Sequence, residues 1–455
     1  MIENFKKLHF VGIGGVGMSA IAYVINKLGY AVSGSDEKAN SLTEKLQAEG
    51  VKVYIGHGKE NIADSDAIVV SSAIKEDNPE IVEAKKLGIP ILHRSDILAE
   101  LMNSRYGIAI AGAHGKTTTT SMLSCVAIKA GLDPTVLIGG EVTALNGNAH
   151  YGKSDYLIAE ADESDGSFLK FHPHIAVVTN VENDHMDYYH TMDDMKKAFK
   201  QFISQLSADG KVILCFDDEI LRSMGKDANG KLISYAIDHE ADYQAVNIDY
   251  QETMTTYDVA YKGQILGKIQ LVVPGRHNVL NSLAVVAVSM LLGIEFDKVA
   301  QVMTEFIGAK RRFEIKGQAK GVLVVDDYAH HPSEIRSTLI AANQRKHKRL
   351  ICVFQPHRYS RTQLLLDDFS KCFTPCDLLV LSDIYAASEQ PIAGITGQTL
   401  VDKVKENTKQ DVVYAQSVSD VTDYLKTVVQ DGDLVITLGA GDIYKSGELL
   451  LNELK

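Results

Sequence analysis

The sequence predicts an α/β protein of three domains, and three observations carry that prediction. The chain has 455 residues, and a domain usually holds about 100–200 residues. Short apolar runs alternate with helical patterns along the chain, which is typical of parallel sheets covered by helices. Hydrophobic residues make up 45% of the chain and charged residues 23%, so there is apolar material for more than one core.

Residues 1–103 are predicted to form a Rossmann-like first domain. Residues 7–15 (KLHFVGIGG) predict a strand that runs into a glycine turn, and residues 19–29 predict a helix closed by Gly29. Further strands are expected at residues 31–36, 52–57 and 67–73. This alternation of strands and helices indicates a parallel sheet with helices on both faces.

Residues 104–309 are predicted to form a central P-loop ATPase domain. Residues 106–132 again predict a strand, a glycine loop and a helix. Further strands are expected at residues 155–162, 174–181 and 211–216. Residues 242–273 predict hairpins, so we expect a small antiparallel sheet beside the parallel one, followed by a buried helix at 281–293.

Residues 310–455 are predicted to form a Rossmann-like third domain. Its strands are expected at residues 321–329, 349–356, 377–384 and 433–441, with helices between them.

Charge and cysteine usage exclude several classes of protein. The formal net charge of -13 disfavours a nucleic-acid groove, and no run reaches the ~18–20 apolar residues of a membrane span. The N-terminus shows no long apolar run after its lysines, and we expect a soluble protein. Five irregularly spaced cysteines predict reduced thiols and a cytoplasmic protein: Cys125, Cys215, Cys352, Cys372 and Cys376.

The strongest local signal for function is the loop 112–117 (GAHGKT), which lies between a predicted strand and a predicted helix. Backbone N–H groups of such a loop point at an anion. The Lys116 ammonium adds charge for the β- and γ-phosphates, and the Thr117 hydroxyl can bind Mg²⁺. The usual motif has glycine where this chain has Ile110, so the loop is shorter than usual. The pattern favours a nucleotide phosphate site over an ordinary tight turn.

A second glycine loop, 12–17 (GIGGVG), follows the first predicted strand and opens a helix. Asp36 ends the next strand, about twenty residues further on, where dinucleotide folds place the acid that binds a ribose. Taken alone, the loop favours an NAD-dependent oxidoreductase. It establishes only that a diphosphate can rest on this helix N-terminus, so the nucleotide remains open.

Two acidic segments follow strands of the central domain. Residues 160–165 (EADESD) place four acids within six positions, where carboxylates repel one another unless a cation is present. We therefore expect a Mg²⁺ site there, with a solvated acidic loop as the alternative. Residues 182–187 (ENDHMD) bring His185 to a strand end, where α/β folds bind ligands. A capping or packed histidine is the alternative reading of His185.

The third domain adds two polar segments. Residues 326–332 (DDYAHHP) end a predicted strand, and residues 355–361 (QPHRYSR) include Arg358 and Arg361. Guanidinium groups bind carboxylates and phosphates through two hydrogen bonds, so we expect these arginines to face such a group. Solvated surface arginines are the alternative.

Together these segments resemble the Mur ligases of peptidoglycan synthesis and, within that family, the branch that adds L-alanine. The resemblance covers essentially the whole chain and rests on the order of nine segments. They are GIGGVGMS, VVSSAI, GAHGKTTTT, EADESDGSF, NDHMD, PGRHNVLN, RRFE, DDYAHHP and HRYSRT. Such ligases usually carry threonine where this chain has Ala113.

The resemblance implies a role for each group of residues. The first domain would hold a UDP-sugar rather than NAD, through Gly12, Gly14, Gly15, Gly17, Met18, Ser19, Ser35, Asp36, His57, Ser71, Ser72 and Arg94. His57 would lie near the uracil. ATP would contact Gly112, Ala113, His114, Gly115, Lys116, Thr117, Thr118, Asn278, Asn281, Arg312 and Asp327. Thr117 and Glu160 would bind one Mg²⁺ or Mn²⁺, and His185 would bind a second ion near the acceptor carboxylate. The amino acid or the product would contact His330, His331, His357, Arg358 and Arg361. The catalytic residues would be Lys116, His185, Arg312 and Asp327.

The implied activity is an ATP-dependent ligase that joins L-alanine to the lactyl carboxylate of UDP-N-acetylmuramate through an acyl phosphate. The implied partners are these small molecules, without nucleic acid or membrane, and the protein would be a monomer or a homodimer. His185 or a histidine of the third domain would deprotonate the amine.

Three other functions remain open at this stage. A ligase that attaches a recycled tripeptide to the same UDP-sugar has a related first domain, whereas folate-polyglutamate synthetases share only the second and third domains. The first domain alone suggests an NAD-dependent oxidoreductase. A nucleotide-binding switch without catalysis is the third alternative.

Overall fold

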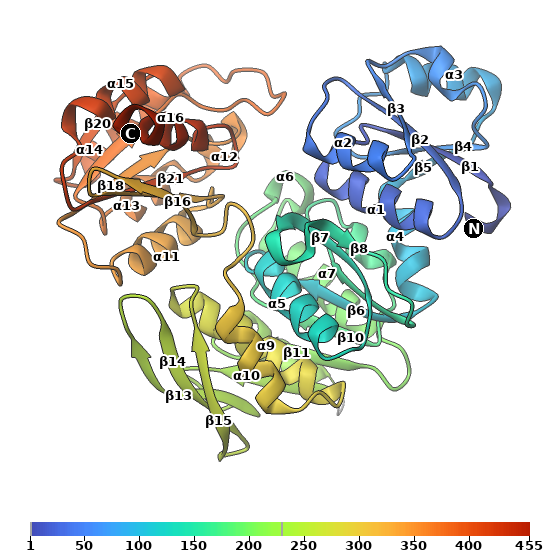
Figure 1. Ribbon diagram of the computed structural model, residues 1–455, viewed down its shortest axis with the longest axis horizontal. Coiled ribbons are helices and arrows are strands. Elements are labelled where there is room, and N and C mark those ends of the chain that lie inside the picture. The colour runs from blue at the N-terminus through green and yellow to red at the C-terminus, as the bar shows by residue number, and fades with distance from the viewer. Residues whose placement is uncertain (1, 229–230) are drawn as a thin grey trace. The chain divides into compact units, whose positions relative to one another are not determined.

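The structure is a computed structural model that describes residues 2–228 and 231–455 (Figure 1). It confirms the predicted α/β class, with three sheets of five, ten and six strands. The chain divides into two compact units. One comprises Met1–Val246, Asp258–Ile269 and Leu280–Glu305, and the other comprises Asn247–Tyr257, Gln270–Val279 and Phe306–Lys455. We retain domain boundaries near residues 103 and 310 as a proposal.

The N-terminal sheet is fully parallel, as predicted, with the strand order β3-β2-β1-β4-β5. Its strands are β1 (Lys7–Val11), β2 (Ala31–Asp36), β3 (Lys52–Ile55), β4 (Ala67–Val70) and β5 (Ile91–His93). Its helices are α1 (Val16–Lys27), α2 (Ser41–Ala48), α3 (Pro79–Leu87) and α4 (Arg94–Asn103). The chain leaves β1 toward β2 on one side and reaches β4 on the other. Such a switch point forms a ligand crevice at the carboxyl ends of the strands.

Local sequence sets the ends of these helices. The Asn40 side chain accepts hydrogen bonds from the backbone of Leu42 and Thr43, which fixes the start of α2. Helix α3 starts with Pro79 and stops at Gly88, whose φ of 71° lies in the left-handed region.

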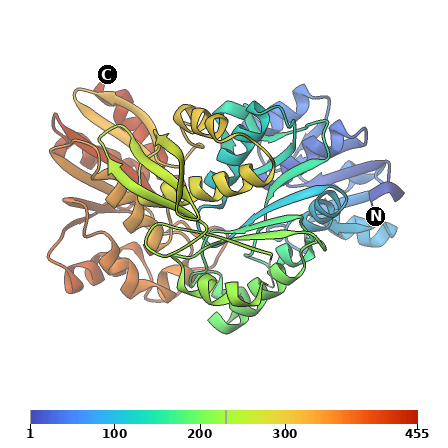
Figure 2. The same cartoon turned by 90° about the horizontal axis from the view of Figure 1, so that it is seen from below.

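The central sheet has the strand order β15-β14-β13-β12-β11-β10-β6-β9-β7-β8. Its strands are β6 (Tyr106–Ala111), β7 (Thr135–Val142), β8 (Gly147–His150), β9 (Tyr156–Glu160), β10 (Ile175–Val178), β11 (Lys211–Cys215), β12 (Leu232–Ala236), β13 (Tyr243–Tyr250), β14 (Thr255–Tyr261) and β15 (Gln264–Leu271). Its helices are α5 (Lys116–Lys129), α6 (Met186–Tyr189), α7 (Met192–Ser204), α8 (Glu219–Met224), α9 (Arg276–Leu291) and α10 (Phe296–Glu305). Helices α9 and α10 (yellow) lie on one face of the strands and α7 (green) on the other (Figure 2).

One detail of this sheet differs from the prediction. The strands expected as a separate small antiparallel sheet, β13 to β15, extend the central sheet, because β13 pairs parallel with β12. Antiparallel pairing does occur, between β7 and β8 at the opposite edge. The sequence predicted the hairpins. It carried no signal for the pairing of β13 with β12 or of β7 with β8, because such pairing depends on long-range register.

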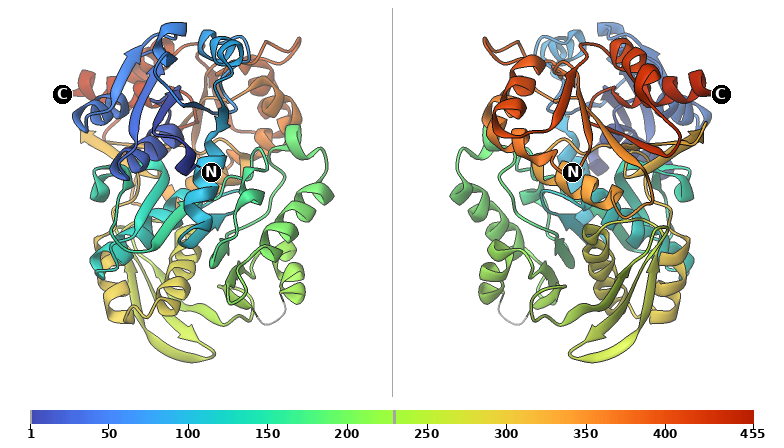
Figure 3. Two further views of the ribbon diagram at one scale, coloured as in Figure 1. Left: turned by 90° about the vertical axis from the view of Figure 1, so that its right-hand side faces the viewer. Right: turned by 90° about the vertical axis from the view of Figure 1, so that its left-hand side faces the viewer.

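The C-terminal sheet has the order β16-β17-β21-β18-β19-β20 and is parallel except for the edge pair β16 and β17. Its strands are β16 (Glu314–Ala319), β17 (Val322–Asp327), β18 (Arg349–Phe354), β19 (Leu378–Leu381), β20 (Asp411–Tyr414) and β21 (Asp433–Leu438). Its helices are α11 (Pro332–Ala342), α12 (Tyr359–Leu364), α13 (Leu366–Cys372), α14 (Gly397–Asn407), α15 (Val418–Val428) and α16 (Tyr444–Leu454). Helices cover both faces of the sheet (Figure 3), and each face has its own apolar core.

The cysteines agree with one of the sequence expectations. All five cysteines are free and buried. Within the described ranges, no helix combines the length and the apolar character needed to cross a bilayer.

Candidate active site

The P-loop joins β6 to α5 and needs glycine at two positions. Gly112 and Gly115 have φ values of 125° and 86°, which favour glycine. A Cβ at Gly112 would stand 2.1 Å from Thr179 Oγ1, and one at Gly115 would stand 2.6 Å from Asn281 Oδ1. Among the described side chains, none caps the N-terminus of α5. This helix end therefore offers N–H groups and a positive dipole to an anion.

The Lys116 ammonium lies inside the P-loop. Its Nζ donates to the carbonyl oxygens of Gly112 (2.6 Å) and Ala113 (3.2 Å) and to Glu163 Oε1 (2.7 Å). Burial opposes the charge, but nearby carboxylates, Glu163 foremost, outweigh burial and raise the lysine pKa. The lysine is therefore a fixed positive charge at neutral pH, at the place predicted for ATP phosphates.

The residues predicted to hold a metal form an oxygen-lined corner beside the P-loop. Thr117 Oγ1 lies 3.2 Å from Glu160 Oε2, and the other Glu160 oxygen accepts from the Gly139 N–H at 2.7 Å. A hydroxyl and a carboxylate next to a phosphate site suit Mg²⁺, which prefers hard oxygen donors. The donor set of Thr117 and Glu160 therefore fits this cation.

His185 lies at the edge of the same site. Its backbone has a φ of 56°, in the left-handed region. Its Nε2 lies 3.7 Å from Glu163 Oε1 and 3.6 Å from Asp184 Oδ2, and the Tyr189 hydroxyl donates to the Glu163 carbonyl oxygen at 2.5 Å. The structure thus brings Lys116 and His185 to one carboxylate, Glu163, which the sequence indicated only as one acid of the segment 160–165.

Asn180 and Thr179 are also absent from the predicted site residues, although both end a predicted strand. Asn180 Oδ1 accepts from the His114 N–H at 2.8 Å, and its Nδ2 donates to the His114 carbonyl oxygen at 3.0 Å. Thr179 Oγ1 donates to the same carbonyl oxygen at 2.5 Å. These bonds fix the shape of the P-loop, and their place at the carboxyl end of β10 was the signal that could have found them.

The glycine loop of the N-terminal domain is tied to the end of β2. The N–H groups of Gly12 and Ile13 donate to the Ser35 carbonyl oxygen at 2.8 and 2.9 Å. The Gly14 N–H donates to Asp36 Oδ2 at 2.8 Å. Asp36 thus binds the glycine loop itself, whereas a dinucleotide-binding fold would use the acid at this position to bind a ribose. Met18 and Ser19 of α1 are buried, and Ser19 Oγ accepts from Asn148 Nδ2 at 3.0 Å.

Residues at the carboxyl ends of β4 and β5 meet the acidic segment of the central domain. Ser72 Oγ donates to Asp165 Oδ2 at 2.9 Å and lies 3.2 Å from His93 Nε2. Arg94 Nη2 donates to Asp162 Oδ2 at 2.7 Å. Burial opposes the charge of Asp162, but Arg94 and Lys116 lower its pKa to about 2. These bonds join the predicted sugar site to the P-loop side of this unit.

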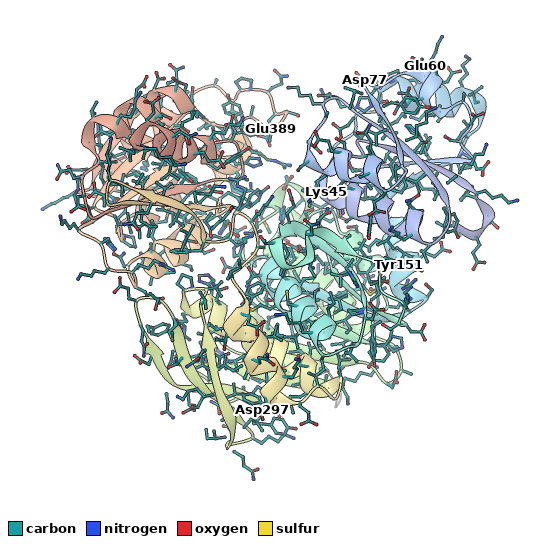
Figure 4. All side chains as sticks on the ribbon, in the orientation of Figure 1. Lys45, Glu60, Asp77, Tyr151, Asp297 and Glu389 are labelled. Atoms are coloured by element: carbon teal, nitrogen blue, oxygen red, sulfur yellow. The ribbon has the colours of Figure 1, made fainter. Side chains whose placement is uncertain are left out.

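A further ion pair joins the N-terminal domain to the central domain. Lys45 of α2, labelled in Figure 4, pairs with Glu141 of β7, with Nζ 3.3 Å from Oε2. Asn148 of β8 donates to the Val16 carbonyl oxygen at 2.6 Å, at the start of α1.

In the C-terminal domain, the predicted ATP contacts Arg312 and Asp327 lie near one another. Asp327 accepts from the Phe313 N–H (2.7 Å) and from the Ala329 N–H (2.8 Å). Burial raises its pKa to about 6, and the nearby Arg312 pulls the other way. The Arg312 guanidinium lies 5.2 Å from the centre of the Tyr328 ring.

The neighbouring residue, Arg311, received no role from the sequence but anchors this segment. Its Nε donates to Asp326 Oδ2 at 2.9 Å, and its Nη atoms donate to the carbonyl oxygens of Gly439 (2.6 Å) and Gly441 (3.1 Å). Its guanidinium lies between the rings of Tyr328 and Tyr444, at 5.0 and 4.7 Å. Arg311 has a φ of 58°, a strained value that these contacts hold in place.

The histidines of this domain divide into two kinds. His331 caps α11, since its Nδ1 accepts from the Ser333 N–H. His357 stacks on Tyr385, with ring centres 5.7 Å apart, and its Nδ1 lies 3.5 Å from Arg361 Nη1. Burial, followed by Arg361 and Arg358, lowers the pKa of His357 to about 4, so the ring is neutral at neutral pH.

The structure also places four other predicted site residues, which are His330, Arg358, Asn278 and Asn281. His330 Nδ1 lies 3.1 Å from the Tyr328 carbonyl oxygen, and Arg358 has a φ of 69°. The Asn278 side chain donates to the Pro274 carbonyl oxygen at 2.6 Å, whereas Asn281 lies against Gly115 of the P-loop.

Family models match almost the whole chain. The Mur ligase family catalytic domain matches residues 7–106, the Mur ligase middle domain residues 110–289, and the Mur ligase glutamate ligase domain residues 311–441.

Individual relatives agree with these matches. The UDP-N-acetylmuramate–L-alanine ligase of Geotalea uraniireducens is 47% identical over 455 residues, covering 100% of this chain and 99% of its own length. That of Syntrophotalea carbinolica is 48% identical over 450 residues, covering 99% and 98%. The solved UDP-N-acetylmuramate-alanine ligase of Thermotoga maritima has a TM-score of 0.84 at 29% identity, covering 98% of both chains. A solved murein peptide ligase of Psychrobacter arcticus has a TM-score of 0.72 at 25% identity, covering 99% and 98%. The chain therefore belongs to the Mur ligase family.

Proposed function

We propose that this protein is a cytoplasmic, ATP-dependent ligase that joins L-alanine to the lactyl carboxylate of UDP-N-acetylmuramate. One observation carries the proposal. The Arg94–Asp162 and Ser72–Asp165 hydrogen bonds link the glycine loop domain to the segment that holds Lys116 and Glu160. A substrate spanning that junction would place a diphosphate at one glycine loop and a carboxylate near the other. The full-length relatives named for this reaction support the choice of amino acid.

The chain's own residues would activate the carboxylate chiefly by placing charge. A carboxylate is a poor electrophile, and transfer of the ATP γ-phosphate would convert it to an acyl phosphate. The bond to the β-phosphate breaks as the bond to the carboxylate oxygen forms, and ADP leaves. Lys116 and the N–H groups at the start of α5 would neutralise the phosphate oxygens in this step. The alanine nitrogen then attacks the acyl carbon, and inorganic phosphate leaves.

Thr117 and Glu160 would hold one Mg²⁺ and His185 a second, and these ions would supply charge neutralisation on the phosphate oxygens. The attacking amine must lose a proton, and a histidine of the C-terminal domain would accept it. Arg358 and Arg361 would hold the amino acid carboxylate, because guanidinium forks bind carboxylates well.

Replacement of the proposed metal carboxylate tests this arrangement. Glu160→Gln should raise the Mg²⁺ concentration needed for half-maximal ADP release by about tenfold or more, since an amide binds Mg²⁺ more weakly than a carboxylate. The matched control is Glu141→Gln, which removes a carboxylate of β7 that pairs with Lys45. An unchanged Mg²⁺ dependence in Glu160→Gln would remove Glu160 from the metal site.

The reaction itself is tested by ADP release with MgATP and UDP-N-acetylmuramate. L-Alanine is supplied, omitted, or replaced by the tripeptide L-alanyl-γ-D-glutamyl-meso-diaminopimelate. We expect ADP release that depends on L-alanine. Release only with the tripeptide would favour the recycling reaction, which the likeness to a solved murein peptide ligase keeps as the second candidate. Absence of release with either donor would contradict both.

A further inference from the structure

A buried polar network lies beneath the carboxyl ends of β2 and β3, and the chemistry described above does not use it. At its centre is Glu80, the second residue of α3, whose side chain is 0% exposed. Glu80 Oε2 accepts from Ser35 Oγ at 2.6 Å, and Oε1 accepts from Asn61 Nδ2 at 2.6 Å. His9 Nε2 and His57 Nδ1 both lie 3.5 Å from Oε2. A carboxylate is expensive to bury, so such a dense set of partners calls for a function.

The network keeps Glu80 ionised. Burial alone would raise its pKa, but hydrogen bonds from His9, Ser35 and Asn61 outweigh burial and lower it to about 2. Its position in the first turn of α3 also favours negative charge. An ionised carboxylate can only accept hydrogen bonds. Glu80 therefore imposes a direction on every hydrogen bond that reaches it.

This direction determines which nitrogen of His57 carries the proton. The Ser35 hydroxyl has one proton, and the 2.6 Å bond to Glu80 uses it. Ser35 Oγ also lies 2.9 Å from His57 Nδ1, so in this bond Ser35 must accept and Nδ1 must donate. A neutral His57 then has a bare Nε2, which is an acceptor. Nε2 has no hydrogen-bond partner in the described parts of the chain, and the side chain remains 14% exposed.

The nucleotide end of the substrate belongs on this side of the N-terminal sheet. A diphosphate on the glycine loop after β1 leaves two directions for the rest of the ligand, over β4 and β5 or over β2 and β3. The first direction leads to Ser72 and Arg94, which contact Asp165 and Asp162 beside the P-loop, so the reacting sugar must lie there. The nucleobase would therefore lie over the carboxyl ends of β2 and β3, where His57 lies.

We infer that Glu80 is a positioning residue that, through Ser35, holds His57 as a hydrogen-bond acceptor for the ring N3–H of uracil. This inference rests on the proposed function and extends it to the choice of nucleobase. Cytosine has a bare nitrogen at the same position, so two lone pairs would face each other. The site would therefore select a pyrimidine with a protonated N3.

The tautomer of His57 is the direct test. ¹⁵N-histidine spectra of the full-length protein distinguish a proton on Nδ1 from one on Nε2, and the signal lost in His57→Gln identifies His57 among the 15 histidines. We expect the Nδ1–H form in the native protein. In Glu80→Gln the new amide can donate to Ser35, which reverses the relay, and the Nε2–H form should appear. An Nε2–H form in the native protein would overturn the inference.

Substrate discrimination is the second test. With UDP-N-acetylmuramate and its cytidine counterpart, kcat/KM should favour uridine by about 10–100-fold in the native protein. In His57→Gln this ratio should approach one, because the amide can present either its oxygen or its nitrogen. In Glu80→Gln the KM for the uridine substrate should rise while kcat is kept. Retention of the native ratio in His57→Gln would contradict the inference.

A matched control stays within the same network. Ser33→Ala removes the hydroxyl that lies 2.9 Å from His9 Nδ1, two residues from Ser35 on β2, and leaves the relay intact. It should keep both the tautomer and the discrimination, and loss of either would show that general disruption of the network explains the other variants. If neither nucleotide sugar supports ADP release, the proposed function fails, whereas the tautomer measurement still decides the relay.

Discussion

Lys116→Ala should lower kcat by about 10²–10³-fold or more, because it removes a fixed positive charge from the proposed phosphate site. The side chain lies inside the P-loop, bonded to two loop carbonyl oxygens and to Glu163. Binding of UDP-N-acetylmuramate should persist, since its proposed site lies on the N-terminal sheet. The measurement pairs ADP release with calorimetric titration of the UDP-sugar. Equal loss of both would contradict this division of labour.

Two further variants separate the catalytic charge from local disruption. Lys116→Ala leaves Glu163, whose side chain is 1% exposed, without its ammonium partner. In Lys116→Ala with Glu163→Gln that bare carboxylate is gone, so activity should stay low if the lysine acts on phosphate. Recovery in the double variant would instead indicate that the lysine only neutralises Glu163. Lys129→Ala, in the last turn of the same helix, removes an exposed lysine and should leave turnover unchanged.

Arg311→Ala should lower the free energy of unfolding of the C-terminal domain by about 3–5 kcal/mol, because it breaks a largely buried ion pair. Asp326, 1% exposed, would keep only its hydrogen bond from Thr437, and two backbone carbonyl oxygens would lose donors. Hydrogen exchange at the amides of β17 and β21, which pair between Asp326 and Thr437, reports the loss locally. Arg311→Lys should retain only part of the stability that Arg311→Ala loses, since an ammonium cannot replace the planar guanidinium fork.

The neighbouring arginine supplies the matched control. Arg312→Ala should destabilise the domain by about 1 kcal/mol, less than Arg311→Ala, because it removes the charge that favours ionised Asp327, and it should raise the KM for ATP. Arg311→Ala should speed hydrogen exchange at the amides of β17 and β21 more than Arg312→Ala does. If both variants unfold the domain equally, Arg311 has no special anchoring role. If Arg312→Ala leaves the KM for ATP unchanged, Arg312 is not an ATP contact.

The sequence by itself determined the α/β class and the location of the phosphate loop. Local patterns predict both: apolar runs of strand length, glycines at positions where φ is positive, and a lysine directly at a helix start. The order of the family segments along the chain then predicted the family by resemblance. Neither conclusion needed knowledge of which strands pair.

Only the tertiary structure decided the partners of the site residues. Lys116 meets Glu163 47 positions away, Arg94 meets Asp162 68 positions away, and Arg311 meets Gly439 128 positions away. No local pattern encodes such pairs, since they arise from strand order and register in the sheets. Glu80 is the clearest case: its sequence context is that of an ordinary acid in the first turn of a helix. Only folding buries it between Ser35 and Asn61, where the cost of an unpaired carboxylate fixes the hydrogen bonds around it.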